Sequence, residues 1–427
     1  MRRGSRSTPF RCGRFGRGGK LRRRSWMATW RRWAMSVEWP LRRLTDVVSL
    51  PKGQVSPLDP PYRSQFLLAP DHVEPGTGAI LRLETAEWQG AISGKYVVRP
   101  GDVVFSKIRP ALRKVALADF TGICSADMYP LRPREEMVGG FVKAVLLGDQ
   151  FSRYVESLSG RTGIPKVNRG DLEGFWLPVP PLSEQRRIVE VIDSFTGLER
   201  GIEASIAKFD ALRSGLMEEL AELECGQFGE VLKQGPQNGI YKPARSYGLQ
   251  GTPIVRIDSF SRGKSDLTRG LLRVSVKGSE IAQYGLDVGD IVINRVNTPD
   301  LVGKSTSVRR LIEPTIFESN MMRCKLIYSA ADPVFTETWL GSSIVKRYFL
   351  QCAKSAISQA SINGDDVRNC PFPKMSLPGQ LAFLERLNAV DDQRLAEAAE
   401  LAKLRQLKQG LVDDLLSGRV AVSAAVA

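Results

Sequence analysis

The stretch LPVPPLSEQRRIVEVIDSF, residues 177–195, has a counterpart 195 positions later, FPKMSLPGQLAFLERLNAV at residues 372–390. In a wider ungapped comparison, residues 168–220 match residues 363–415 at thirteen of fifty-three positions, where chance gives roughly three. The identical pairs include Asn168 with Asn363, Asp171 with Asp366, Pro178 with Pro373, Leu182 with Leu377, Gln185 with Gln380, Lys208 with Lys403, Gly215 with Gly410, and Leu216 with Leu411. The chain therefore contains an internal repeat, which indicates a duplicated task.

Two earlier blocks repeat in the same order at smaller offsets. Pro100–Lys107 (PGDVVFSK) corresponds to Val288–Arg295 (VGDIVINR), and we expect Ile80–Glu84 to correspond to Ile254–Asp258. Because the offsets differ, each copy keeps one scaffold and varies its insertions. This pattern is typical of two recognition modules that have different targets.

Each copy ends in a predicted long helix. Apolar residues alternate in threes and fours from Ser183, a good N-cap, and the second copy repeats the pattern as far as Gly418. A helix of roughly 35 to 40 residues is about 50 to 60 Å long, so neither helix can bury its apolar stripe against one compact domain. The first helix ends where the second module begins, and the second helix begins where that module ends. We therefore expect the two helices to pack antiparallel on each other.

Some helix positions do not fit a simple apolar seam. Glu199 and Arg213 interrupt it, and Gly215 and Gly410 lie inside the helices at matching register. A helix-interior glycine costs about 1 kcal/mol relative to alanine. Either close approach of the helices or inherited duplication accounts for the pair.

The modules themselves contain mostly short β-like runs bounded by Gly, Pro, Asp and Ser. The expected strands are Ile80–Leu83, Val103–Phe105, Ile254–Ile257, Val274–Val276 and Ile291–Ile293, and helical patterns cover Val142–Leu158 and Val334–Ala353. Each module is therefore predicted to be mixed α/β with a curved sheet.

The net charge of +15 is concentrated at the beginning of the chain. Residues 1–34 hold eleven Arg and one Lys without an acidic residue, which leaves only +3 for the rest. Residues 1–35 can be a transit-type segment, a disordered nucleic-acid arm or sequence upstream of the true start, and we favour the last interpretation. Any basic surface on the body of the protein must then be local.

Composition excludes several classes of site. The six cysteines are far apart in sequence and the chain has one histidine, His72, so neither a zinc cluster nor a His-based triad is expected. The scattered thiols suit a reducing cytoplasm, and no apolar run has the roughly 18 to 20 residues of a membrane span. We expect His72 to be an exposed loop residue.

The segment Leu177–Val189 (LPVPPLSEQRRIV) resembles the junction into the central helix of type I restriction-modification specificity subunits, and Leu404–Val420 (LRQLKQGLVDDLLSGRV) resembles their closing helix. The resemblance covers roughly residues 36–420, and the second junction is a weaker match because Gly379 stands where the first has Glu184. It implies an α+β fold with two mixed α/β target-recognition domains, separated by a coiled-coil spacer of two long antiparallel helices related by a pseudo-twofold repeat. The expected domains are a 1–35 extension, recognition domain 36–180, central helix 181–225, recognition domain 226–375, C-terminal helix 376–420 and tail 421–427.

The resemblance also implies a non-catalytic role. Such a chain reads a bipartite site in double-stranded DNA and docks two methyltransferase subunits and, in some systems, restriction or translocase subunits. It binds no cofactor of its own, and S-adenosylmethionine, ATP and Mg²⁺ are expected on the partner subunits. A self-sufficient methyltransferase or nuclease and a coiled-coil adaptor without DNA reading are the alternatives.

Two motifs invite an enzymatic interpretation. Asp59–Tyr62 (DPPY) is the tetrapeptide of adenine-N6 methyltransferases, but it follows a turn-like stretch and we interpret it as a proline-rich surface turn. Val302–Thr306 (VGKST) has Thr298 where a phosphate loop needs its first glycine. We expect a β-hairpin with a basic tip there.

Cationic and amide side chains follow each Gly-Asp block and precede each long helix. Arg and Asn can contact base edges bidentately, whereas Lys more often contacts phosphate, although a solvated polar surface is an equal alternative for any single residue. The candidates for DNA binding are Lys107, Arg109, Arg113, Lys114, Arg161, Thr162, Lys166 and Asn168 in the first copy, and Arg295, Asn297, Lys304, Ser358, Gln359, Ser361 and Asn363 in the second.

Overall fold

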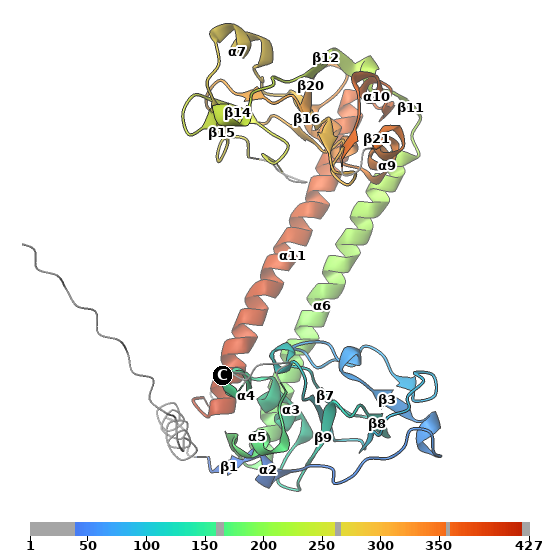
Figure 1. Ribbon diagram of the computed structural model, residues 1–427, viewed down its shortest axis with the longest axis vertical. Helices are drawn as coiled ribbons and strands as arrows, with labels where there is room; N and C mark the ends of the chain where they lie inside the picture. Colours follow the sequence, from blue (N-terminus) through green and yellow to red (C-terminus); the bar gives the residue numbers. More distant parts are fainter. Residues whose placement is uncertain (1–38, 159–165, 261–265, 356–358, 421–427) are drawn as a thin grey trace, which may run out of the picture. The chain divides into compact units, whose positions relative to one another are not determined.

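The computed structural model describes residues 39–158, 166–260, 266–355 and 359–420 (Figure 1). The chain divides into two compact units: unit 1 comprises Met1–Gly201 and Glu400–Ala427, and unit 2 comprises Ile202–Ala399. The Arg-rich extension 1–35 and the tail 421–427 lie outside the described residues. Within the described ranges, no helix is both long enough and apolar enough to cross a membrane.

Unit 1 is built on two four-stranded sheets, with strand orders β2-β9-β6-β7 and β4-β3-β8-β5, and on the strand pair β1-β10. The strands are β1 (Leu41–Arg43), β2 (Val48–Ser49), β3 (Phe66–Leu68), β4 (Glu84–Thr85), β5 (Tyr96–Val98), β6 (Val103–Ser106), β7 (Val115–Leu117), β8 (Gly122–Cys124), β9 (Met128–Pro133) and β10 (Trp176–Pro178). The helices are α2 (Leu44–Val47), α3 (Gly139–Leu147), α4 (Asp149–Leu158) and α5 (Arg169–Glu173), with 3-10 turns η1 (Tyr62–Ser64), η2 (Pro70–His72) and η3 (Pro110–Leu112). Helix α3 lies against β6, β7 and β9, where it closes the main core (Figure 1).

Unit 2 repeats this plan with the sheets β12-β20-β16-β18 and β13-β15-β14-β19, the small sheet β17-β22-β21 and the pair β11-β23. The strands are β11 (Cys225–Gln227), β12 (Leu232–Asn238), β13 (Tyr247–Gly248), β14 (Thr252–Val255), β15 (Leu272–Val274), β16 (Ile291–Asn294), β17 (Val296–Asn297), β18 (Ser305–Ser307), β19 (Ile316–Phe317), β20 (Met321–Leu326), β21 (Lys354–Ser355), β22 (Ala360–Ser361) and β23 (Pro371–Pro373). The helices are α7 (Gly278–Tyr284), α8 (Pro333–Leu340), α9 (Ser343–Cys352) and α10 (Gly364–Arg368), with 3-10 turns η4 (Phe228–Val231) and η5 (Ala244–Ser246).

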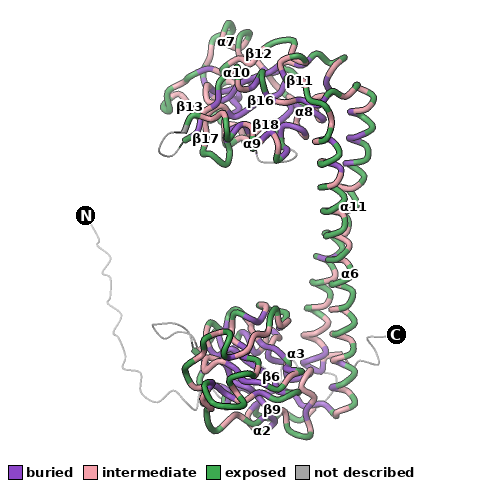
Figure 2. The backbone as a smooth tube through the Cα atoms, turned by 90° about the vertical axis from the view of Figure 1, so that its right-hand side faces the viewer, coloured by how far each residue is buried: buried purple, intermediate pink, exposed green. Residues whose placement is uncertain are grey.

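The central strands of the two units correspond. β6 pairs antiparallel with β9 and β7, and β16 pairs antiparallel with β20 and β18. Every residue of β6 and of β16 is buried, which explains their continuous apolar character (Figure 2). The predicted strands after both Gly-Asp blocks, and the predicted mixed α+β fold, are therefore confirmed.

The two long helices are α6 (Leu182–Ala221) and α11 (Leu377–Ser417), and the boundary between the units falls inside both. In unit 2, Glu219 of α6 pairs with Arg386 of α11 at 3.0 Å, and Arg213 pairs with Asp391 at 3.1 Å. In unit 1, Lys408 Nζ lies 2.8 Å from Glu199 Oε2. Residue numbers rise along one helix as they fall along the other, so the predicted antiparallel packing is confirmed. The polar residues that interrupt the apolar seam are those that form these cross-helix ion pairs.

The predicted equivalence of Ile80–Glu84 with Ile254–Asp258 is wrong. Only Glu84–Thr85 forms a strand there, and Leu81 is 61% exposed. The counterpart of β14 is β3, because β14 pairs in parallel with β19 as β3 pairs in parallel with β8. The alternation of apolar and polar residues in this exposed loop therefore led to the wrong prediction of a strand.

Three other expectations need correction. The expected strand Val274–Val276 lies two residues earlier, at β15, because Leu272, Arg273 and Val274 are the residues that pair with β14. A Cβ added at Gly215 or Gly410 would have no atom within 4 Å, so close helix approach does not explain these glycines. His72 is only 2% exposed, and its Nδ1 accepts a hydrogen bond from Ala69 N at 3.3 Å. Tertiary packing over η2 encloses this histidine.

Candidate nucleic-acid interface

The Gly-Asp block of each copy forms a turn held by a buried carboxylate. In unit 1, Asp102 accepts a hydrogen bond from Arg99 N at 2.9 Å and two from Arg132 at 2.8 and 2.9 Å. Asp102 is 1% exposed. This aspartate therefore holds the turn closed and anchors it to strand β9.

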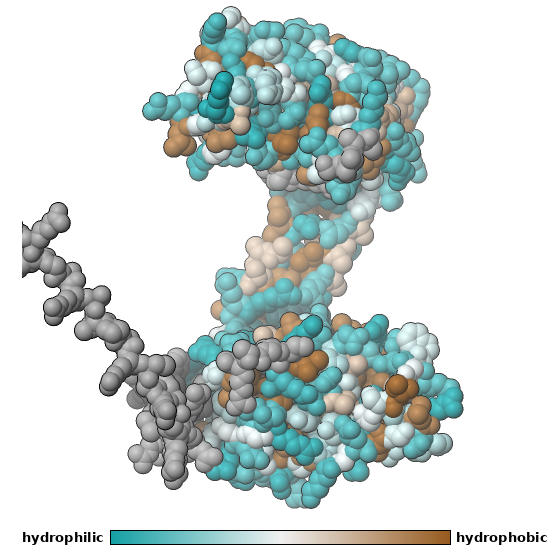
Figure 3. Space-filling view, viewed as in Figure 1, coloured by the Kyte–Doolittle hydropathy of each residue, from teal (hydrophilic) through white to brown (hydrophobic). Residues whose placement is uncertain are grey.

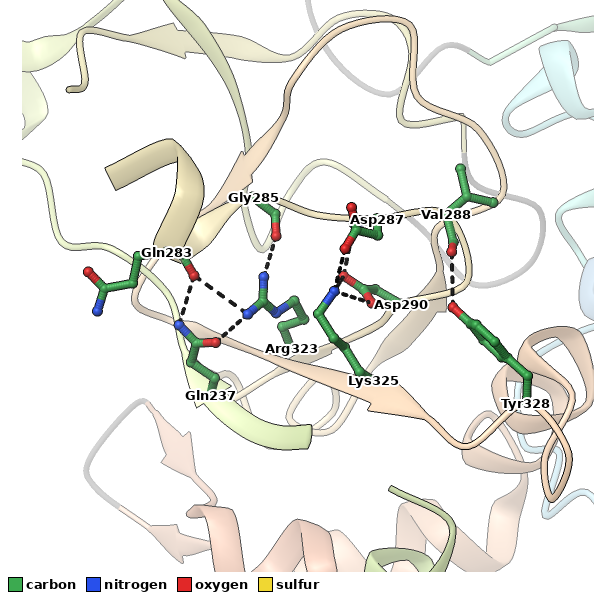
Figure 4. A network of polar contacts seen from close by, with 9 residues as sticks. All are labelled: Gln237, Gln283, Gly285, Asp287, Val288, Asp290, Arg323, Lys325 and Tyr328. Carbon is green, nitrogen blue, oxygen red and sulfur yellow. Dashed lines mark hydrogen bonds and ion pairs between the residues drawn. The ribbon is translucent and has the colours of Figure 1, made fainter. Parts of the chain in front are cut away.

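Unit 2 has the same device with a lysine in place of the arginine (Figure 4). Asp290 accepts from Asp287 N at 2.9 Å, and Lys325 Nζ lies 3.3 and 3.4 Å from its two carboxylate oxygens. Burial raises the pKa of Asp290, and Lys325 opposes that rise. Tyr328 donates a hydrogen bond to Val288 O across the same turn. The repeated Gly-Asp motif is thus explained as a structural support for the strand that follows it.

Where strand β6 ends, unit 1 brings together the two segments that the sequence predicts as a reading surface. Lys107 N donates to Asp127 O at 2.9 Å, and Val167 N donates to Lys107 O at 2.8 Å. Ile108 forms an antiparallel bridge with Lys166. The residues after the Gly-Asp strand therefore lie beside the residues before helix α5, and we call this edge the unit 1 edge (residues 107–109, 127 and 166–169).

Unit 2 builds the same edge after β16. Arg295 N donates to Asn320 O at 2.8 Å, and Ile362 N donates to Arg295 O at 3.0 Å. Strand β17 then pairs antiparallel with β22. We call residues 295–297, 320 and 359–364 the unit 2 edge. Its hydrogen bonds to and from Arg295 reproduce those to and from Lys107 in the unit 1 edge.

The cations of the unit 1 edge surround an aromatic ring. Lys107 is 8% exposed, and its Nζ lies 4.9 Å from the centre of the Tyr129 ring. Arg169 places its guanidinium carbon 5.7 Å from the same centre. Lys166 Nζ is 4.0 Å from Asp127 Oδ1. Sequence reasoning missed Tyr129, Asp127 and Arg169, although Arg169 directly follows the predicted Asn168.

Arg109 is the candidate with the greatest freedom at this edge. It is exposed, its φ is 48°, and within the described ranges its side chain has no hydrogen bond or ion pair. Positive φ in a non-glycine residue is strained and is concentrated at functional sites. The loop therefore directs an unpaired guanidinium into solvent next to Lys107.

Three other predicted candidates point into the protein. Arg113 donates to Asp149 Oδ1 at 2.8 Å, and Lys114 donates to Pro70 O at 2.6 Å. Lys304 donates to Ile257 O at 3.0 Å and Phe260 O at 2.6 Å. Their ammonium and guanidinium groups are occupied by these contacts, and DNA binding by these residues stays a prediction.

Asn168 and Asn363 serve as helix N-caps. Asn168 Oδ1 accepts from Asp171 N at 2.9 Å, and Asn363 Oδ1 accepts from Asp366 N at 3.1 Å. Each aspartate accepts in return from the backbone N–H of its asparagine. These two reciprocal capping boxes explain why both residues of each pair recur in the repeat.

The remaining candidates differ in their accessibility. Gln359 is exposed, whereas Asn297 and Ser361 are half-buried within the β17-β22 pair, where Asn297 Oδ1 accepts from Thr298 N at 2.8 Å. Arg161, Thr162 and Ser358 lie outside the described residues.

The enzymatic motifs take ordinary structural positions. Asp59 O accepts from Tyr62 N at 2.9 Å in an exposed turn that leads into η1, so the prediction of a surface turn is confirmed. Strands β16 and β18 form the predicted hairpin, but Lys304 lies at its base, where its backbone carbonyl accepts from Asn294 N. The prediction of a basic residue at the tip of the hairpin was therefore wrong. Among the described residues, no group of three or more His, Cys, Asp or Glu side chains could hold a metal ion.

Comparison with known proteins shows which proteins have similar sequences. Residues 37–208 match the family model of the type I restriction modification DNA specificity domain. Over 183 residues the chain is 32% identical to the specificity subunit of the type I restriction enzyme EcoDI from Escherichia coli, an alignment that covers 42% of this chain and 40% of that subunit. Over 323 residues it is 24% identical to the type I restriction enzyme MjaVIII specificity subunit from Methanocaldococcus jannaschii, with coverage of 70% and 75%.

Two solved structures share the fold. A chain from a study of complex assembly and conformational transition of the type I R-M system superposes with a TM-score of 0.63 at 20% identity, covering 90% of this chain and 98% of that one. The HsdS subunit from Thermoanaerobacter tengcongensis superposes with a TM-score of 0.53 at 20% identity, covering 90% and 97%.

Two similar α+β units, each with an equivalent edge and each joined to a long helix, define a protein with an internal structural duplication. Residues 37–208 thus carry a type I restriction modification DNA specificity domain, and the chain is similar to type I restriction enzyme specificity subunits, although the first of these alignments spans less than half of that relative's length.

Proposed function

We propose that this chain is a non-catalytic DNA specificity subunit that reads one half of a bipartite duplex site with each of its two edges. The observation that carries the proposal is the duplication of the edge itself. Lys107 and Arg295 stand at the same position, each donating its backbone N–H to the turn before β9 or β20 and accepting from the segment before α5 or α10. Two equivalent edges that carry different side chains suit two different half-sites.

The chemistry of the edges supports nucleic acid as the ligand. Exposed Arg109 and Lys166 provide donors for base edges and phosphates. Asn297 and Gln359 of the unit 2 edge are amides of the kind that pair with adenine.

The similarity to specificity subunits supports a proposal for the partners. Two methyltransferase subunits would dock on this chain, with restriction or translocase subunits in a complete restriction complex, and S-adenosylmethionine, ATP and Mg²⁺ would bind to those partners. The antiparallel pairing of α6 and α11, with equivalent residues on each, supports two equivalent docking places. The reaction would take place on the partners while this chain selects the DNA.

Selection of bound sequences from a random duplex library tests the proposal directly. The purified chain, alone and with its methyltransferase, is expected to enrich one motif of two short half-sites around a spacer of constant length and unspecified sequence. Arg109→Ala should relax the preference in one half-site and Asn297→Ala should relax it in the other. Enrichment of no motif by the assembled complex would contradict the proposal.

A further inference from the structure

The two edges have the same backbone and different charge. Equivalent positions follow from the shared hydrogen bonds: Lys107 corresponds to Arg295, and Asp127 corresponds to Asn320. The Ile108–Lys166 bridge corresponds to the Val296–Ser361 pair, so that Arg109 corresponds to Asn297 and Lys166 to Ser361. Arg169 and Gly364 are each the first residue of the helix that follows.

At these five positions the two edges differ in the charge of their side chains. The unit 1 edge carries four cations and one carboxylate, namely Lys107, Arg109, Lys166, Arg169 and Asp127. The unit 2 edge carries one cation and four uncharged residues, namely Arg295, Asn297, Ser361, Gly364 and Asn320. Duplication preserved the framework, and the side chains on it diverged in charge.

The positive charges of the unit 1 edge are not neutralised by close ion pairs among the described residues. Lys107 has no hydrogen bond from its ammonium among the described residues, and the Tyr129 ring is its charge-stabilising neighbour. Arg109 is exposed, and its side chain has no hydrogen bond or ion pair with the residues that the structure describes. Lys166 meets Asp127 only at 4.0 Å, with side-chain exposures of 55% and 48%. Exposed pairs of this kind are weak, so this edge keeps a net positive field.

Arg169 holds its place through Tyr129 and through a hydrogen bond to Pro51 O. Both contacts leave the residue exposed. A guanidinium that is held in place by these contacts and is still exposed to solvent is suited to bind a phosphate oxygen. Less side-chain entropy is lost when such a group binds.

The apolar surface nearby does not compete with this interpretation. The large exposed apolar side chains of unit 1 include Trp88 (73%) and Ile92 (78%), which lie in the β4-β5 connection. The visible face of unit 1 is mostly hydrophilic, with several hydrophobic patches (Figure 3). The two edges differ in the charge of their side chains.

From this asymmetry we infer that the two recognition units divide the work of DNA binding: the unit 1 edge supplies most of the phosphate contacts, and the unit 2 edge discriminates mainly through amide and hydroxyl contacts to bases. The inference rests on the proposed function and deepens it. Its physical signature is the salt dependence, because removal of one cation that binds a phosphate reduces the slope of log affinity against log salt concentration by about one.

The test measures binding of the full chain to a duplex carrying its selected motif over a range of salt concentrations. Lys166→Gln with Arg169→Gln in unit 1 is expected to reduce the slope by about two and to weaken binding to all sequences alike. The matched pair in unit 2, Asn297→Ala with Ser361→Ala, is expected to leave the slope unchanged and to reduce the affinity difference between the selected motif and a motif altered in one half-site. Thermal unfolding of each variant controls for loss of structure.

A reciprocal variant tests the inference by gain. Ser361→Lys with Gly364→Arg transplants the unit 1 cations onto the unit 2 edge. A Cβ at Gly364 would meet only Arg368 Nη1 at 3.4 Å and Pro236 Cβ at 4.0 Å, which are ordinary contacts. This variant is expected to steepen the slope by about one to two.

The outcomes separate the two claims. Wild-type protein without salt-dependent DNA binding would overturn the proposed function and this inference together. Wild-type binding whose slope is equally sensitive to the unit 1 and unit 2 pairs, or insensitive to the transplanted cations, would overturn the inference and leave the proposed function standing.

Discussion

Gln185 and Gln380 occupy the same place in the two units, and each is fully buried with its side-chain amide joined to three backbone groups. Gln185 accepts from Val138 N at 2.8 Å and donates to Glu136 O and Pro180 O at 2.9 Å. Gln380 accepts from Asp332 N at 2.9 Å and donates to Ala330 O and Met375 O at 2.8 and 2.9 Å. The first turn of each long helix is thereby joined to the loop before α3 or α8.

We predict that Gln380→Ala lowers the free energy of unfolding by about 2 to 4 kcal/mol, because it leaves three partly buried backbone groups without this side-chain partner. Denaturant unfolding monitored in unit 2 measures the loss. Gln406→Ala, at an exposed position of the same helix, is the control and is expected to change stability by less than about 0.5 kcal/mol. Equal effects of the two substitutions would show that the buried amide has no special role.

The partly buried pair Lys408–Glu199 is predicted to contribute more than the exposed pair Arg386–Glu219. Side-chain exposures are 22% and 14% in the first pair and 58% and 61% in the second. Lys408 also donates to Thr196 Oγ1 at 3.0 Å. Double-mutant cycles should give a coupling of about 1 to 2 kcal/mol for the first pair and below about 1 kcal/mol for the second. A larger coupling in the exposed pair would contradict the role assigned to burial.

Gly215→Ala and Gly410→Ala are each predicted to stabilise the protein by about 1 kcal/mol, because alanine is the better helix former and its Cβ would meet no atom within 4 Å. Thermal unfolding of the single and double variants checks the gain. Loss of methyltransferase assembly by a stabilised variant would indicate that the glycines serve a partner surface.

Asp290 and Asp287 share Lys325 and are predicted to have opposite pH dependence. Burial raises the pKa of Asp290, so its contribution to stability is full below the unfolded pKa and is lost as the pH rises through the folded pKa. The hydrogen bond from Lys325 lowers the pKa of Asp287, so its contribution is full above the unfolded pKa and is lost as the pH falls through the folded pKa.

Unfolding of the wild type, Asp290→Asn and Asp287→Asn between about pH 2 and pH 7 measures these contributions, because the pKa of Asp287 lies below its ordinary value and that of Asp290 above it. The wild type should gain stability relative to Asp290→Asn as the pH falls, and should lose stability relative to Asp287→Asn. The second effect should be the smaller one, because the Asp287 side chain is 76% exposed. Parallel pH profiles for both variants would refute the assignment.

The elements that the sequence predicted correctly are those with an unambiguous local cause. Continuous apolar runs after a Gly-Asp turn specify β6 and β16, and the long alternation after the Pro-rich junction specifies α6. The helical pattern over Val142–Leu158 is real but is divided at Gly148 into α3 and α4. The alternation at Ile80–Leu83 misled because a period of two does not distinguish a strand from an exposed loop.

The candidate site was predicted in part for a similar reason. The two segments of each edge follow from their place before and after predicted elements. Tyr129 and Asp127 join Lys107 only through sheet pairing and loop hydrogen bonds, which no local pattern encodes. The inward direction of Arg113 and Lys114 depends on Asp149 and on Pro70 O, both supplied by other parts of the chain.

The most direct measurement of the central claim is a genome-wide map of methylated adenine in cells with and without this gene, under conditions where the gene and a partner methyltransferase are both expressed. The proposed role predicts that deletion removes methylation at one motif, two short half-sites around a spacer of constant length, and that the intact gene restores it. An unchanged map would contradict the assignment of DNA specificity to this chain.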